Sequence, residues 1–182
     1  MSHGKSITLI LGGVRSGKSR FAQKLAARHS SVAFVATARP SDEEMRRKIE
    51  RHKADRPAQW STIEEPLFLE TVLRQQAATF SLLLVDCLTL YTSNLMTAEK
   101  EDPEAVLHRV DMLCDALRSG ESSVVLVSNE VGSGIVPAYP SGRMFRDLLG
   151  EINQRVAAVA DNVLFMVAGL PLVVKGELEV RS

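Results

Sequence analysis

Five short apolar runs recur along the chain, and longer stretches with helical spacing separate them. The runs cover residues 7–11, 32–36, 82–86, 124–128 and 163–167. Each run is uninterrupted, which is typical of strands covered on both faces. Such runs between helices predict an α/β fold, with a mostly parallel sheet, helices on both faces and right-handed crossovers. Because ligands in such folds lie at the carboxyl ends of the strands, the residues after each run are the first candidates for chemistry.

The stretches between the runs predict helices by their apolar spacing and their end signals. We expect helices over residues 19–28, 65–78, 88–96 and 103–118, and a longer helix capped by Ser141. Asp102 and Pro103 fit the N-cap and first position of the helix over residues 103–118. Residues 60–64 fit a further short strand that ends in a carboxylate, and the tail from Leu170 is expected to be extended.

A strongly basic segment follows the second run. Ser41 and Glu44 fit a capping box at its start. The helix that would follow places Met45, Ile49 and His52 on one face. Its many Lys and Arg residues are typical of a solvated face. On spacing alone, His52 is either a structural residue of the apolar face or a nucleophile whose imidazole the surrounding cations keep neutral.

The turn between the first run and the first helix has the sequence GGVRSGKS, at residues 12–19. It fits the phosphate-binding pattern G-x-x-x-x-G-K-[ST], in the strand-to-helix context that this P-loop requires. Backbone N–H groups of such a loop cradle phosphate oxygens at the start of the helix. Lys18 would reach the β- and γ-phosphates, and the Ser19 hydroxyl would ligate Mg²⁺. The loop predicts a P-loop NTPase fold that binds a nucleoside triphosphate.

Two other runs are followed or closed by polar residues. The run at residues 82–86 ends in Asp86, which matches the Walker-B arrangement of a carboxylate that holds Mg²⁺. An aspartate at a strand end is also common in any α/β protein. Residues 129–134, Asn-Glu-Val-Gly-Ser-Gly, follow the run at residues 124–128. They fit either a loop close to a ligand or an ordinary strand exit.

Composition and charge limit the number of domains, the kinds of partner and the cellular compartment that we expect for this chain. With 182 residues, 45% of them apolar and 24% charged, the chain suits one globular domain over residues 1–182. Lys+Arg and Asp+Glu are equal at 22 each, so net charge gives no reason to expect nucleic acid or an acidic membrane as partner. Cys87 and Cys114 lack metal-ligand spacing, which favours free thiols in a reducing compartment. Without a signal peptide or an apolar run approaching the ~20 residues of a membrane span, we expect a cytoplasmic protein.

The motifs extend over most of the chain and belong together. They comprise residues 12–19, 36–38, 42–45, 52–57, 60–64, 129–137, 146–147 and 153–155, with the acid-ended strand at Asp86. Together they resemble the bifunctional adenosylcobinamide kinase/adenosylcobinamide-phosphate guanylyltransferase of cobalamin biosynthesis. The arginine inside the P-loop and the run at residues 129–137 are much more specific than a bare P-loop.

This resemblance implies two reactions. In the first, the terminal phosphate of ATP or GTP moves to the aminopropanol hydroxyl of adenosylcobinamide. In the second, GTP guanylylates a histidine, which falls on His52, and pyrophosphate leaves. GMP then passes to adenosylcobinamide phosphate and gives adenosylcobinamide-GDP. A P–N linkage suits such a transfer because imidazole attacks without losing a proton, and because one displacement becomes two.

The resemblance also implies the residues of the site. The catalytic residues are His52 and Lys18, and the metal ligands for Mg²⁺ are Ser19 and Asp86. The nucleotide-binding residues are Gly12, Gly13, Val14, Arg15, Ser16, Gly17, Lys18, Ser19, Thr37, Ala38, Arg39, Lys53, Ala54, Asp55, Arg56, Glu64 and Asp86. The substrates are GTP, ATP and the corrinoid, and the family's trimeric assembly implies a homotrimer here.

Two other functions fit the P-loop and the strand ends. One is a different small-molecule P-loop kinase, in which His52 is structural and no guanylyl transfer occurs. The other is a nucleotide-binding regulatory protein that hydrolyses slowly and signals to partners. Covalent labelling by GTP at the α-phosphate separates the first alternative from the bifunctional enzyme, and corrinoid-dependent turnover separates the second.

Overall fold

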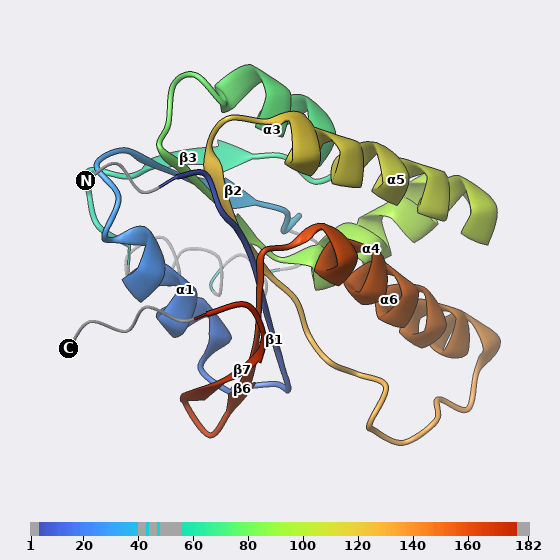
Figure 1. Ribbon diagram of the computed structural model, residues 1–182. Coiled ribbons are helices and arrows are strands. Elements are labelled where there is room, and N and C mark those ends of the chain that lie inside the picture. Colours follow the sequence, from blue (N-terminus) through green and yellow to red (C-terminus); the bar gives the residue numbers. More distant parts are fainter. Residues whose placement is uncertain (1–3, 40–42, 44–46, 48–55, 178–182) are drawn as a thin grey trace.

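A seven-stranded sheet forms the centre of the molecule (Figure 1). The computed structural model describes residues 4–39, 43, 47 and 56–177. The strands are β1 (Ile7–Gly12), β2 (Val32–Ala36), β3 (Ser61–Glu64), β4 (Leu82–Asp86), β5 (Ser123–Val127), β6 (Asn162–Val167) and β7 (Leu170–Lys175). They lie in the order β3-β2-β4-β5-β1-β6-β7, and every neighbouring pair is parallel except β6 and β7. The predicted mostly parallel sheet is confirmed.

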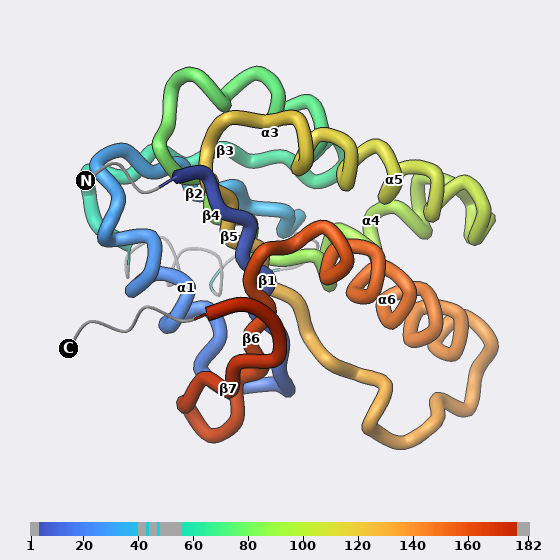
Figure 2. The backbone as a smooth tube through the Cα atoms, viewed as in Figure 1, coloured from blue at the N-terminus to red at the C-terminus, as the bar shows by residue number. Residues whose placement is uncertain are grey.

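Helices cover both faces of the sheet, as Figures 1 and 2 show. One face carries α1 (Lys18–Ala26), and the other carries α3 (Leu69–Gln76), α4 (Leu88–Ala98), α5 (Pro103–Ser119) and α6 (Pro140–Val159). Two apolar cores result. Leu9 belongs to the core under α3–α6, whereas its neighbour Ile10 belongs to the core under α1. The strands are uninterrupted apolar runs because successive side chains enter different cores.

Some helix ends follow their local signals. The Asp102 carboxylate accepts hydrogen bonds from the N–H groups of Glu104 (3.0 Å) and Ala105 (3.4 Å), as the predicted N-cap requires. α5 then begins with Pro103 and ends at Ser119, within one residue of the predicted end. Local side-chain chemistry therefore sets the start of α5.

Other predicted ends are wrong. α6 begins at Pro140 with Tyr139 at its N-cap, so Ser141 lies inside the helix and caps nothing. The helix expected from residue 65 begins only at Leu69. Before it, the Glu65 carboxylate accepts the N–H groups of Leu67 and Phe68, both at 2.9 Å, and these bonds hold a turn in place of the first helical turn.

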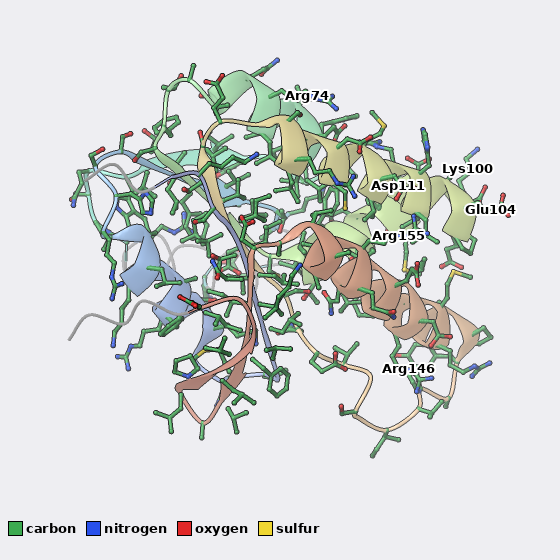
Figure 3. The ribbon with its side chains drawn as sticks, viewed as in Figure 1. Arg74, Lys100, Glu104, Asp111, Arg146 and Arg155 are labelled. Atoms are coloured by element: carbon green, nitrogen blue, oxygen red, sulfur yellow. The ribbon has the colours of Figure 1, made fainter. Side chains whose placement is uncertain are left out.

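Arg155 joins the two longest helices, α5 and α6. Its guanidinium lies 2.6 Å from the Asp111 carboxylate on α5, and Figure 3 shows these two side chains between the helices. It also lies 2.9 Å from Glu151 on its own helix. Hydrogen bonds to Glu151 and then Asp111 raise the pKa of Arg155. This motif residue, which the sequence grouped with candidate functional segments, thus fixes helix packing.

The tail from Leu170 is extended, as expected, and forms the edge strand β7. A tight turn at Ala168 and Gly169, both with positive φ, joins it to β6 as an antiparallel hairpin. Several of its apolar side chains face solvent, with Leu170 72% and Val174 64% exposed. Among the helices of the described residues, none has the length and apolar character that crossing a membrane needs.

Candidate functional site

Two glycines, Gly12 and Gly17, shape the P-loop where it leaves β1 and enters α1, and a side chain at either position would be strained. Gly12 has φ 152°, and a Cβ there would lie 2.7 Å from both the Met166 carbonyl oxygen and the Ser16 hydroxyl. Gly17, the N-cap of α1, has φ 95°, and its Cβ would lie 3.2 Å from Gly169 Cα. The loop therefore packs against the β6–β7 turn, where the Gly169 N–H also donates to the Ser16 carbonyl (3.0 Å).

Lys18 folds back across this loop. Its Nζ donates to the Gly13 carbonyl at 2.5 Å and lies 3.4 Å from the Ser16 hydroxyl. Burial lowers the pKa of Lys18, and the nearby Cys87 and Asp86 act in the opposite direction. A bound polyphosphate would favour the charged ammonium further, because an opposite charge offsets desolvation. The Lys18 ammonium therefore lies at the start of a helix, where it is suited to bind phosphate.

The ends of β2, β3 and β4 lie side by side near the P-loop. In the sheet register, Ala36 pairs with Glu64 on one side and with Asp86 on the other. Burial lowers the pKa of Arg56, and the charges of Asp86 and Glu64 oppose this effect. Both carboxylates are therefore within electrostatic reach of one guanidinium, and Asp86 is also within reach of Lys18.

Arg56 is held against β2. Its guanidinium carbon lies 3.4 Å from the centre of the Phe34 ring, and one terminal nitrogen lies 3.4 Å from the Thr62 hydroxyl. Its Nε is buried and has no hydrogen-bond partner among the described residues. A guanidinium with donor capacity left, beside the strand ends, is suited to a nucleotide.

Thr37 ties the end of β2 to the end of β4. Its hydroxyl donates to the Cys87 carbonyl and accepts from the Cys87 N–H, both at 2.8 Å. The Asn94 side chain on α4 donates to the carbonyl of Thr37 (2.8 Å) and to that of Pro66 (3.1 Å). Asn94, which sequence reasoning missed, thereby connects three chain segments at the edge that carries the site.

The segment after β5 lies directly against the P-loop. The Ser128 N–H donates to the Ile10 carbonyl (2.9 Å), and the Glu130 N–H donates to the Gly12 carbonyl (3.1 Å). The sequence left open whether this segment was a ligand loop or a strand exit. Its backbone bond to the first glycine of the loop brings the segment beside the start of the P-loop.

The oxygen donors near the loop fit a magnesium ion that is coordinated by both the protein and the phosphates of a nucleotide. Mg²⁺ is usually held by one or two carboxylates together with phosphate oxygens and water. Ser19 lies in the first turn of α1, and Asp86 ends β4 within electrostatic reach of Lys18. Among the described residues, no group of three or more His, Cys, Asp or Glu could hold a metal by itself.

Solved structures with this fold are distant in sequence. An ATPase of a bacterial type III secretion system superposes with a TM-score of 0.55 and 14% identity, over 88% of this chain and 50% of that chain. The chain thus spans half the length of that ATPase. A protein from Pyrococcus horikoshii OT3 superposes with a TM-score of 0.58 and 7% identity, over 97% of this chain and 89% of that chain. These likenesses show the α/β P-loop NTPase fold.

Sequence similarity decides the family. The family model described as cobinamide kinase / cobinamide phosphate guanyltransferase matches residues 8–174. The chain belongs to this family. Its relatives include proteins named bifunctional adenosylcobalamin biosynthesis protein from Pseudomonas aeruginosa, 45% identical over 93% of this chain and 97% of the relative, and from Salmonella typhimurium, 39% identical over 92% and 98%. The protein of that name from Escherichia coli is 35% identical over 92% of this chain and 98% of its own.

Within this cobinamide kinase / guanyltransferase fold, the predicted site residues divide into two groups. The structure brings together the P-loop, Thr37, Arg56, Glu64 and Asp86 at the carboxyl edge of the sheet. Val14, Arg15 and Arg39 are exposed there, and Ala38 is half-buried.

The second group lies outside the described residues. It consists of His52, Lys53, Ala54 and Asp55, together with the capping box of Ser41 and Glu44 and the apolar face of Met45 and Ile49. Of the predicted basic helix, the structure describes Glu43 and Arg47, an exposed i,i+4 ion pair at 3.7 Å. The role of His52 therefore rests on the sequence.

Proposed function

We propose that this chain phosphorylates adenosylcobinamide and then guanylylates the phosphorylated product, in cobalamin biosynthesis. The observation that carries the proposal is the family match over residues 8–174. The assembly of the P-loop, Asp86 and Glu64 at one edge of the sheet supports it. A single domain, residues 1–182, would carry both activities.

In the first reaction, the P-loop N–H groups and Lys18 would hold the phosphates of ATP or GTP. The ammonium of Lys18, freed from the Gly13 carbonyl, would stabilise charge on the transferred phosphoryl group. Ser19 and Asp86 would hold Mg²⁺, which neutralises phosphate charge when bound.

In the second reaction, a His52 ring nitrogen would attack the α-phosphorus of GTP, and pyrophosphate would leave. The phosphate of the corrinoid would then attack the same phosphorus and free the imidazole. Arg56, four residues after His52, lies against the strand ends beside Asp86 and Glu64, which supports a nucleophile at this edge. Thr37, Ala38, Arg39, Glu64 and residues 53–56 would surround the guanine nucleotide.

Labelling tests the covalent step directly. Protein is incubated with Mg²⁺ and GTP labelled at the α-phosphate, and the expected result is protein-bound label that is acid-labile and alkali-stable. The label should be absent in His52→Ala and present in His108→Ala, a matched control on the exposed side of α5. His52→Ala should keep phosphoryl transfer. Label that survives in His52→Ala would exclude this nucleophile, and a different small-molecule kinase would show no label at all.

We propose further that the enzyme is a cytoplasmic homotrimer. The edge strand β7 exposes Leu170, Leu172 and Val174, and an exposed apolar patch at a sheet edge favours association with another chain. The free thiols of Cys87 and Cys114 fit a reducing compartment. Light scattering coupled to gel filtration should give three times the mass of the chain, and a monomer would refute the assembly.

A further inference from the structure

Glu130 follows β5, the strand that lies between the strand ending in Asp86 and the strand leading into the P-loop. β5 lies between β4, which ends in Asp86, and β1, which leads into the P-loop. Parallel strands end at the same edge, so the segment after β5 emerges between those two features, and Figure 1 shows it leaving on the side where β1 ends. The bond from the Glu130 N–H to the Gly12 carbonyl (3.1 Å) then fixes the Glu130 backbone to the start of the P-loop.

Two helices hold the same segment from the other side. The Asn129 N–H donates to the Thr89 hydroxyl on α4 (2.9 Å), and the Asn153 amide on α6 donates to the Asn129 carbonyl (3.1 Å). Glu130 is thus positioned by β1, α4 and α6 together. A catalytic side chain needs this kind of support, because small displacements of a reacting group cost much of its effect.

The Glu130 carboxylate has one oxygen engaged and one available. Oε1 accepts the Gly132 N–H at 2.6 Å, which sets the orientation of the half-buried side chain. A Cβ at Gly132 would lie 2.8 Å from that oxygen, so this orientation depends on the glycine. Within the described part of the chain, no cation or hydrogen-bond donor is bonded to the other oxygen, Oε2. Glu130 differs in this from Asp86 and Glu64, whose charges both act on Arg56.

The first reaction leaves a role for such a carboxylate. An alcohol must lose its proton when its oxygen attacks the γ-phosphorus, and Lys18, Ser19 and Asp86 are engaged with the phosphates and their charge. The second reaction has no such need, since its acceptor is a phosphate and its nucleophile an imidazole. A carboxylate that serves proton transfer should therefore matter to one reaction only.

We propose that Glu130 is a catalytic residue of the kinase step, an inference that rests on the proposed phosphorylation of cobinamide. Its free carboxylate oxygen accepts the proton of the aminopropanol hydroxyl. At the same time the hydroxyl oxygen bonds to the γ-phosphorus. The bond from that phosphorus to the bridging oxygen breaks, and its electron pair leaves with the nucleoside diphosphate. The proton then passes from Glu130 to solvent.

The test compares Glu130→Gln with Glu121→Gln, an exposed control that precedes β5 at the opposite edge of the sheet. Glutamine keeps an oxygen for the Gly132 N–H but cannot take a proton. The two reactions are measured separately, with GTP plus adenosylcobinamide and with GTP plus preformed adenosylcobinamide phosphate. We expect the kinase kcat of Glu130→Gln to fall about 100-fold or more, with the KM for GTP and the guanylyl transfer rate unchanged.

A second variant keeps the carboxylate and moves it. Gly132→Ala should lower the kinase kcat and spare guanylyl transfer, because its Cβ displaces Oε1. It also decides the matter if Glu130→Gln does not fold, since full kinase activity in Gly132→Ala would overturn the proposal. So would a kinase kcat in Glu130→Gln within about threefold of wild type, an equal loss of both reactions, or a change confined to the KM for adenosylcobinamide. A wild-type protein without corrinoid phosphorylation would instead refute the proposed function itself.

Discussion

A buried ion pair between α3 and α5 offers a sharp test of what holds the helical layer together. The Arg109 guanidinium on α5 lies 3.2 Å from the Glu70 carboxylate on α3 and donates to the Leu67 carbonyl at 2.7 Å. It also lies 3.5 Å from Glu99 and stacks 4.7 Å from the centre of the Phe68 ring. One side chain thus joins α5, the turn before α3 and the end of α4.

Replacing Arg109 by Met should be strongly destabilising because of what it leaves behind. The Glu70 side chain is only 4% exposed, so its carboxylate would be buried without its cation. Removing one partner of a buried pair costs about 3–5 kcal/mol. The Arg109 side chain is 16% exposed, which moderates the loss, and we expect the free energy of unfolding to fall by about 3 kcal/mol.

The assay is urea unfolding at one fixed protein concentration, since assembly would make stability depend on concentration. Arg118→Met is the matched control, because its pair with Asp115 has both side chains at least 60% exposed. That control should cost about 0–1 kcal/mol. Adding Glu70→Met to Arg109→Met removes the stranded charge and should restore about 2 kcal/mol, leaving the lost bond to the Leu67 carbonyl.

Two results would refute this reasoning. One is a cost for Arg109→Met that equals the cost of the exposed control. The other is a double variant no more stable than Arg109→Met alone, which would show that the stranded carboxylate is not the source of the loss.

Three further predictions concern the edge of the sheet that carries the P-loop. Lys18→Ala should lower kcat/KM for phosphoryl transfer about 100-fold or more, whereas Lys24→Ala, exposed on the same helix, should match wild type in steady-state assays. Because burial lowers the pKa of Lys18 below its ordinary 10.5, the unfolded chain binds this proton more tightly. The free energy of unfolding of the wild type should therefore rise with pH between the lowered pKa of Lys18 and 10.5. Urea titrations of Lys18→Met should lack this rise, and parallel pH profiles of the two proteins would contradict the prediction. Burial raises the pKa of Cys87 from 9.0 to about 11, so at pH 8 its alkylation should be about 100-fold slower in the folded than in the urea-unfolded protein. Mass spectrometry of iodoacetamide-treated samples measures this, and equal rates would count against a raised pKa of the Cys87 thiol.

Features confined to a few consecutive residues could be predicted from the sequence. The P-loop is one, because every group that shapes it lies within residues 12–19. The cap at Asp102 is another, since it needs only the two N–H groups that follow. Ser141 shows where local signals fail. α6 already begins at Pro140, so Ser141 lies inside the helix and not at its N-cap position.

Other features depend on which strands become neighbours. Glu130 follows β5 and the P-loop follows β1, more than a hundred residues earlier, so their contact depends on strand order. Asn94 likewise meets Thr37 and Pro66 only because α4 packs over the ends of β2 and β3. Glu70 reads as a polar residue of an exposed helix face, and only the approach of Arg109 from α5 explains its burial.

By itself, the sequence determined the parallel α/β architecture, the phosphate loop and the family, because apolar runs and short motifs carry that information locally. The tertiary structure alone decided which polar groups face the loop, since that depends on the order in which the strands pair. Hydrogen bonds and charges act over a few ångströms, and chain spacing does not encode those distances.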